Sequence, residues 1–124
     1  MSTFSTILLL ILAVEHLVIA FMEIMGTPEK QAKAFDLALA YVKQPEARIS
    51  MANQGIYNGM LAIIIIFAQI LITQPNLIYI NILLASFITV VGFFGGLTAT
   101  KKIFLVQMTP GLLAVIVSTL ALYF

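Results

Sequence analysis

The chain has 124 residues, of which 62% are hydrophobic and only 9% are charged. A single small domain does not hide so much apolar surface inside itself, so a water-soluble globule is excluded and a bilayer is the expected solvent. The formal net charge of +1 gives no indication of a nucleic-acid partner, and the lack of cysteine excludes disulfides, zinc–thiolate sites and thiol nucleophiles.

Four stretches are apolar and long enough for a membrane-spanning helix, which needs about 20 residues. The sequence therefore predicts an all-α protein, a four-helix transmembrane bundle formed by one integral membrane domain over residues 1–124. Pro75 and Asn76 indicate a tight turn before the third span, and Pro110 is expected to kink the fourth. The predicted spans are residues 4–25, 49–72, 77–99 and 103–124.

The connection between the first two spans, residues 26–48, is expected to contain a short amphipathic helix on the cytoplasmic membrane surface. Thr27 is suited to the N-cap of that helix and Pro28 to its first position. Two interpretations remain open, a solvated connector that follows the lipid surface and a lid over a pocket. The apolar stripe at helical spacing consists of Phe35, Ala38, Leu39 and Val42.

The basic residues predict an orientation in the membrane. All of them fall in two connections, residues 26–48 and 100–102, which four spans place on the same side. By the positive-inside rule that side is the cytoplasm, so both termini are expected outside a multi-pass protein of the plasma membrane. The six residues are Lys30, Lys33, Lys43, Arg48, Lys101 and Lys102.

The first span carries three ionisable side chains within "LAVEHLVIAFMEIMG", namely Glu15, His16 and Glu23. A charge at that depth costs at least a few kcal/mol, so these groups should face the bundle and be paired or neutral. His16 and Glu23 are seven residues apart and share a helix face. All three are candidates for proton transfer, with a purely structural role as the alternative. No metal is expected, since one histidine and no cysteine make a poor zinc or iron site.

The second and fourth spans supply a matching set of uncharged polar side chains in their cytoplasmic halves. We expect a short connection to bring this set level with His16, where it would orient the polar part of a ligand. Gly55 and Gly59 form a GxxxG pair, which permits close helix packing within one chain or between two copies, or close approach of the backbone to a ligand. The candidate ligand-binding residues are Asn53, Gln54, Tyr57, Asn58 and Gln107.

The order of these motifs resembles a family of small bacterial membrane proteins, the domain of unknown function 1304 (DUF1304) family. The resemblance covers nearly the whole chain through "VEHLVIAFMEIMGTPEKQAKAF", "ANQGIYNGMLA" and "GFFGGLTATKKIFLVQMTPGLLA". It implies a bacterial inner membrane and assigns no activity. Similar proteins often carry a tryptophan after the position of Glu23, and this chain has none. The matching residues are His16, Glu23, Asn53, Gln54, Gly55, Tyr57, Asn58, Gln107 and Pro110.

Three functions remain open. The first is binding or transformation of a small lipophilic molecule in a cytoplasm-facing polar pocket, for which acid–base groups in a dry site would suit an isomerase or hydrolase. The second is a proton-coupled exporter, and the third is a scaffold subunit without catalysis. Because the outer halves of the spans are almost purely aliphatic, an entrance from one side only is favoured. The expected partners are the lipid bilayer, a lipophilic ligand and a second copy in a homodimer, with no cofactor.

Overall fold

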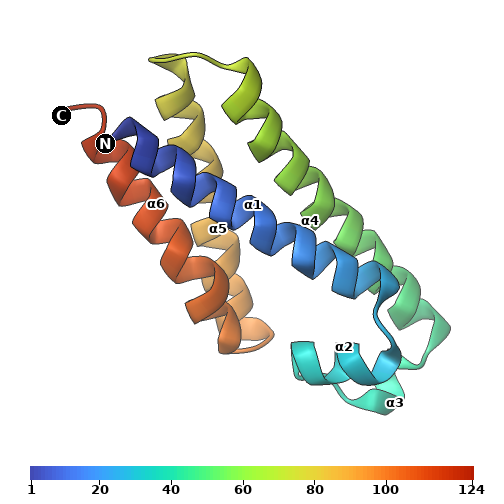
Figure 1. The fold of residues 1–124 in the computed structure, drawn as a ribbon. Coiled ribbons are helices and arrows are strands. Elements are labelled where there is room, and N and C mark those ends of the chain that lie inside the picture. The colour runs from blue at the N-terminus through green and yellow to red at the C-terminus, as the bar shows by residue number, and fades with distance from the viewer.

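The computed structural model describes residues 1–124 and contains helices without strands (Figure 1). Three helices, α1, α4 and α5, are long and apolar enough to cross a membrane, as expected of a multi-pass membrane protein. The fourth predicted span begins with a π-helical turn and ends at Leu120, so it is shorter than the other three. The elements are α1 (Ser2–Met25), α2 (Pro28–Phe35), α3 (Leu39–Val42), α4 (Pro45–Leu71), α5 (Asn76–Thr98), η1 (Phe104–Met108) and α6 (Thr109–Leu120).

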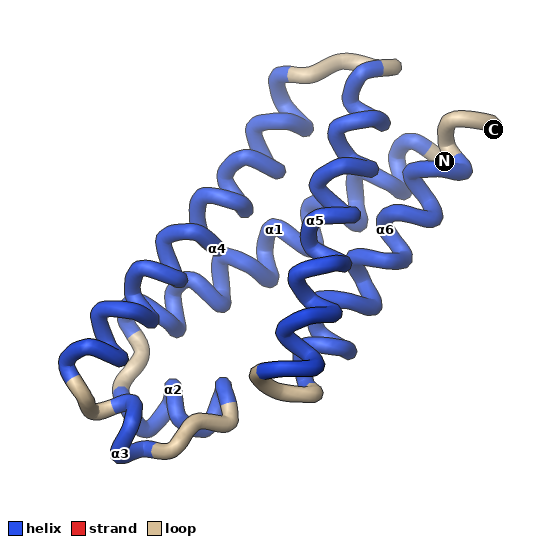
Figure 2. The backbone as a smooth tube through the Cα atoms, turned by 180° about the vertical axis from the view of Figure 1, so that it is seen from behind, coloured by secondary structure: helices blue, strands red, loops and turns tan.

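The helices have two distinct ends, which both backbone views show (Figures 1 and 2). One end carries α2, α3, the turn into α4 and the junction between α5 and η1. We call it the basic end because all six Lys and Arg side chains belong to these segments or to the first turn of α4. The other carries the chain termini and the turn between α4 and α5, and we call it the turn end. From this turn α4 and α5 move apart, while α1 packs mainly on α4 and α5 mainly on α6.

The core is built from leucine, isoleucine and alanine in the middle of the helices. Alanines from four helices are fully buried there, and their small side chains let the backbones approach closely. Many large apolar side chains instead face outward, for example Phe21 and Val90, which suits lipid as the surrounding solvent. The core residues are Leu9, Leu12, Ala13, Ala62, Ile65, Ala85, Ile88 and Ala114.

The GxxxG pair of α4 packs inside the chain. A Cβ atom on Gly55 would lie 2.6 Å from Cγ1 of Ile24 and 3.1 Å from the carbonyl oxygen of Ala20. A Cβ atom on Gly59 would lie 3.5 Å from Cβ of Ala20, an ordinary contact. Of the alternatives for this motif, the structure therefore shows the packing of α1 against α4 within one chain.

The irregularity expected at Pro110 takes the form of the π-helical turn η1. Pro110 has no N–H, so the regular bond to the carbonyl oxygen of Val106 does not form. The Thr109 hydroxyl donates to the carbonyl oxygen of Phe104 at 2.7 Å. Gly92 makes room for this turn, since a Cβ atom there would lie 2.8 Å from the backbone nitrogen of Met108.

The connection 26–48 differs from its prediction in one respect. Thr27 caps α2 by accepting a hydrogen bond from the backbone N–H of Lys30, and Pro28 is the first residue of the helix, as predicted. The expected single amphipathic helix is wrong, because the chain breaks at Asp36, whose φ of 54° is left-handed. The predicted apolar stripe is therefore divided between α2, the break and α3.

Candidate functional site

A cavity of about 790 Å³ lies between α1, α4, α5 and η1, and residues at the end of α2 complete its lining. We call it the inner cavity. Seventeen of its 26 lining residues are hydrophobic, so it combines an apolar wall with a small number of polar groups. Six of the eight candidate residues line it: His16, Glu23, Gln54, Tyr57, Asn58 and Gln107.

The other two candidates, Glu15 and Asn53, do not line the inner cavity. Asn53 is exposed on α4. Glu15 is partly buried, and its Oε1 atom is buried without a hydrogen-bond partner. Successive residues on a helix point about 100° apart, so the residue next in sequence to a cavity residue can point away from the cavity. Glu15 next to His16 and Asn53 next to Gln54 are both examples.

His16 is only 3% exposed, and its orientation is fixed by its own helix. Its Nδ1 atom lies 2.8 Å from the carbonyl oxygen of Leu12. A carbonyl only accepts, so Nδ1 carries the hydrogen and donates it. The second ring nitrogen, Nε2, makes no protein hydrogen bond and remains free for a molecule in the inner cavity.

Glu23 is held by a hydrogen bond across the α1–α4 contact. Nδ2 of Asn58 donates to Oε2 of Glu23 at 2.8 Å. This pairing changes the expected register, because Asn58 lies level with Glu23 instead of with His16. Seven residues of helix separate His16 from Glu23, so the two groups lie about 10 Å apart along α1, at 1.5 Å per residue.

The three other candidate residues in the lining have hydrogen-bonding groups without a partner in the chain. Gln54, Tyr57 and Gln107 make no side-chain hydrogen bond within the chain, although all three line the inner cavity. Tyr57 is 68% exposed and lies at the margin of the site. Each of these side chains both donates and accepts, so the lining can bind a group that does the same.

A clasp at the basic end holds α1, α2 and α4 together, and the sequence pattern did not reveal it. Gln31 is buried in α2, and its Nε2 atom donates to the carbonyl oxygens of Met22 at 3.0 Å and Glu23 at 2.9 Å. Both carbonyls belong to the last turn of α1, where backbone partners run out; the Met22 carbonyl also accepts from the backbone N–H of Gly26. Arg48 donates to Oε1 of Gln31 at 2.9 Å and to the carbonyl oxygen of Gly26 at 3.3 Å. The clasp fixes the end of α1 that carries Glu23.

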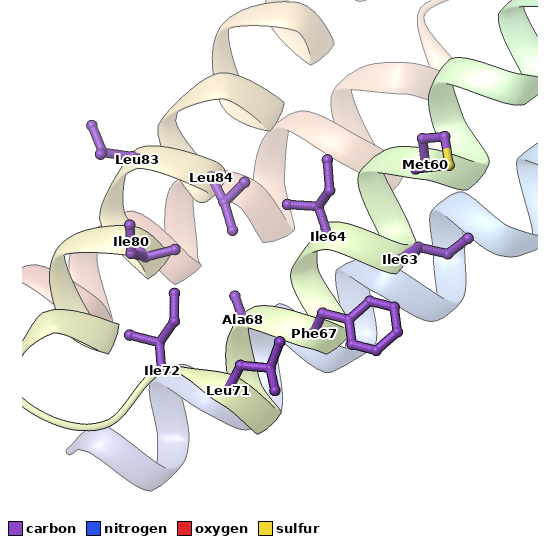
Figure 3. A pocket seen from close by; sticks show the side chains of 10 residues that line it. All are labelled: Met60, Ile63, Ile64, Phe67, Ala68, Leu71, Ile72, Ile80, Leu83 and Leu84. Atoms are coloured by element: carbon purple, nitrogen blue, oxygen red, sulfur yellow. The ribbon is translucent and has the colours of Figure 1, made fainter.

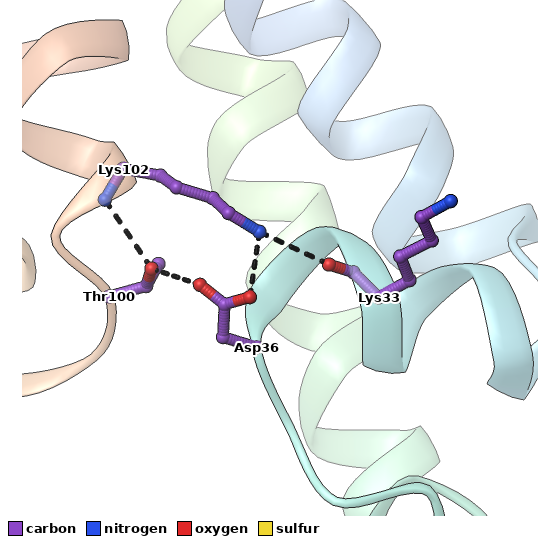
Figure 4. A network of polar contacts seen from close by, with 4 residues as sticks. All are labelled: Lys33, Asp36, Thr100 and Lys102. Atoms are coloured by element: carbon purple, nitrogen blue, oxygen red, sulfur yellow. Dashed lines mark hydrogen bonds and ion pairs between the residues drawn. The ribbon is translucent and has the colours of Figure 1, made fainter.

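A second contact joins the end of α2 to the junction between α5 and η1 (Figure 4). Nζ of Lys102 lies 2.7 Å from Oδ1 of Asp36 and donates to the carbonyl oxygen of Lys33 at 3.3 Å, while the Thr100 hydroxyl donates to Oδ2 of Asp36. The Lys33 side chain itself points away from this group. Hydrogen bonds from Lys102 and Thr100 hold the pKa of the exposed Asp36 carboxyl below its ordinary value of 3.8. We call this contact the Asp36–Lys102 tether.

The turn end is closed by a polar network that takes one residue from each of four helices. The hydroxyl groups of Ser5 and Ser118 form a hydrogen bond with an oxygen–oxygen distance of 2.7 Å, and Nδ2 of Asn81 donates to Oγ of Ser5 at 2.9 Å. Nε2 of Gln69 donates to Oδ1 of Asn81 at 2.7 Å. Ser5, Asn81 and Ser118 are fully buried. Their polarity was visible in the sequence, but their meeting point depends on how the helices pack.

Comparison with known proteins gives a family match over residues 10–119, to the family described as "Protein of unknown function (DUF1304)". The chain belongs to this DUF1304 family. A relative in Lactococcus lactis subsp. lactis (strain IL1403), named "Uncharacterized protein YpaA", is 32% identical over 119 residues, which cover 95% of this chain and 98% of the relative. No solved structure matches the chain. The family resemblance expected from the motifs is confirmed.

The inner cavity of this DUF1304 protein offers proton-transfer and hydrogen-bonding groups within an apolar wall. The protein has no cluster of three or more His, Cys, Asp or Glu side chains of the kind that holds a metal ion. The wall that α1 contributes to the cavity holds two ionisable groups, His16 and Glu23. Lys102 lies at the margin of the cavity nearest the basic end, where it binds Asp36. The chemistry that this arrangement supports is binding, orientation and acid–base transfer.

Proposed function

We propose that this DUF1304 protein is a four-span protein of the bacterial inner membrane, with its basic end in the cytoplasm. Support comes from the six basic side chains, which all belong to one end of the molecule, and from the termini and turn at the other. In this arrangement η1 and α6 together form the fourth span, residues 1–124 form one domain, and α2 and α3 lie at the cytoplasmic surface. The positive-inside rule supplies the orientation.

We further propose that the inner cavity binds or transforms a small lipophilic molecule that enters from the cytoplasmic side. The observation that supports this proposal is the lining of the inner cavity, in which an apolar wall surrounds a few polar side chains. His16 and Glu23 would transfer protons, and the amides and the phenol of Tyr57 would orient the polar part of the ligand. Glu15 lies outside this space and has no part in the proposal.

The alternative of a proton-coupled exporter receives less support. An exporter must open to both sides of the membrane, and therefore needs a path through the turn-end half of the bundle. That half contains the fully buried apolar core and, beyond it, the network of Ser5, Asn81, Ser118 and Gln69. A bundle closed by this network at the turn end suits a binding protein or an enzyme better than a transporter.

The test compares small molecules that remain bound after purification in mild detergent, identified by non-denaturing mass spectrometry. Gln54→Leu and Gln107→Leu each remove a cavity amide that makes no bond within the chain, so both variants should fold. Gln44→Leu is the matched control, since Gln44 is exposed outside the cavity.

We expect one specific molecule on the wild type and on Gln44→Leu, and its loss from Gln54→Leu and Gln107→Leu. If all four proteins carry the same bulk lipids in the same amounts, the cavity does not bind a ligand of its own. The scaffold alternative would then be the better account of this family member.

A further inference from the structure

A second hollow continues from the inner cavity toward the turn end (Figure 3). It has a volume of about 620 Å³, lies between α4 and α5, and is lined by ten residues that are all hydrophobic. We call it the apolar groove. Met60 and Ile64 belong to both linings, so the groove and the inner cavity meet along α4. In Figure 3, Leu84 and Ile80 of α5 face Ile64 and Ile72 at two levels of the groove.

The groove has the dimensions and the exposure that suit a hydrocarbon chain. From Met60 to Leu71 it follows α4 for about 16 Å, at 1.5 Å per residue, and Ile72 lies just beyond the helix end. Its margin is open to the surroundings, because Leu71 is 72% exposed and Leu83 is 66% exposed. An alkyl tail lying there would touch only apolar side chains, and the end nearer α2 would enter the inner cavity, where the polar side chains are.

The lining of the inner cavity also restricts the polar head. An anionic head would be repelled by the Glu23 carboxylate and would find no free cation to bind, since the Lys102 amine is bound to Asp36. A quaternary ammonium head would leave the amides of Gln54 and Gln107 without acceptors. Hydroxyl groups both donate and accept, and so match the amides, the phenol and the free Nε2 of His16.

We propose that the occupant is a single-chain amphiphile with an uncharged, hydroxyl-bearing head in the inner cavity and its alkyl tail in the apolar groove. This inference rests on the proposed binding function and names the class of ligand. The physical reason is the continuity of the two spaces through Met60 and Ile64, which places a cavity with hydrogen-bonding groups at one end of a hydrocarbon-lined path.

The experiment uses the full chain in phosphatidylcholine nanodiscs and a palmitoylglycerol probe that carries a diazirine near the end of its chain. Photolabelled residues are located by peptide mass spectrometry, and excess unlabelled 1-palmitoylglycerol measures saturability. Leu83→Trp fills the groove from an exposed position. Val90→Trp is its control on the same helix, because Val90 is 67% exposed and lines neither space.

We expect saturable labelling of the groove, with a fall of about tenfold in Leu83→Trp and no change in Val90→Trp. Gln54→Leu should lower the labelling as well, because it removes a partner of the head. Palmitic acid and palmitoylcholine should compete much less well than the unlabelled glyceride.

Three results would overturn the inference. If Gln54→Leu lowers the labelling and Leu83→Trp does not, the cavity binds the head but the tail lies elsewhere, so the proposed function stands alone. If Leu83→Trp lowers the labelling and Gln54→Leu does not, the groove holds ordinary lipid and the proposed cavity function fails too. If palmitic acid or palmitoylcholine competes as well as the glyceride, the uncharged head is wrong.

Discussion

At the scale of single residues, the two glycines of α4 have different roles. Replacing either glycine by alanine would stabilise the helix by the same difference in helix propensity, about 1 kcal/mol. Both new Cβ atoms would face α1, but only the one at Gly55 would overlap it, at 2.6 Å from Ile24 Cγ1, whereas at Gly59 the nearest atom, Ala20 Cβ, is at an ordinary 3.5 Å. The difference between the two variants therefore measures the packing of α1 on α4 without the contribution of propensity.

We predict that Gly55→Ala is less stable than Gly59→Ala by about 1–3 kcal/mol, the usual cost of overfilling a packed contact. The free energy of unfolding can be measured by titrating dodecyl maltoside micelles with SDS. Equal stability of the two variants would mean that α1 and α4 do not approach as closely as the structure has them.

The same scale decides which polar residues belong together. Asn58 and Glu23 were both candidates from the sequence, and the structure joins them by a hydrogen bond of 2.8 Å. Glu15 was a candidate for the same reason as His16, its charge at membrane depth, yet the two face different directions. Hydropathy locates a polar residue along a span but gives its angle around the helix only roughly, and a cavity is defined by that angle.

At the scale of elements, the Asp36–Lys102 tether connects α2 with the junction before η1, at the margin of the inner cavity. The pKa of Asp36 is below its ordinary value of 3.8, so the carboxylate form is favoured when the tether is made. Its contribution is therefore fully present above the ordinary pKa and is lost as pH falls through the lowered pKa. Because both side chains are about half exposed, salt should weaken the pair.

We predict that the distance between α2 and the α5–η1 junction is constant from about pH 5 upward and becomes broadly distributed only in stronger acid. Spin labels at Lys30→Cys and Lys101→Cys can report it by pulsed electron resonance, since the chain has no native cysteine. Asp36→Asn should give the broad distribution already at neutral pH. A narrow distribution in Asp36→Asn would show that the Gln31 clasp alone positions α2.

At the scale of the whole molecule, the open question is the path of the chain through the membrane. Three helices are long enough to span it, and the fourth, Phe104–Leu120, is shorter. The four-span proposal places the turn at residues 73–75 and the C-terminus on the same side, opposite to α2 and α3. A chain in which η1 and α6 fail to cross would place the C-terminus on the cytoplasmic side.

We predict that a membrane-impermeant maleimide labels Gln74→Cys and Phe124→Cys in intact bacterial cells, and labels Lys43→Cys only after permeabilisation. All three positions are exposed, so access depends on the compartment alone. Protection of Phe124→Cys together with labelling of Gln74→Cys would establish three spans. Labelling of Lys43→Cys in intact cells would reverse the proposed orientation.

The sequence by itself determined the local properties of the chain, such as the hydropathy of a segment and the start of a helix. Apolar composition and the length of each apolar run predicted an all-helical protein with helices fit for a membrane, and Thr27–Pro28 located the start of α2. The motifs also predicted the family, which the comparison confirmed. Each of these depends on local free energies, of transfer into lipid or of capping, that need no knowledge of neighbouring helices.

The tertiary structure alone decided which side chains meet. The clasp of Gln31 and Arg48, the contact of Asp36 with Lys102 and the separation of Glu15 from the inner cavity all depend on the rotation and register of packed helices. One residue of error in register turns a helix by about 100°, enough to move a side chain from a cavity to the lipid. The meeting of the inner cavity and the apolar groove along α4 has the same origin, because it depends on how α4 and α5 diverge from their turn while α1 packs on α4 and α6 packs on α5.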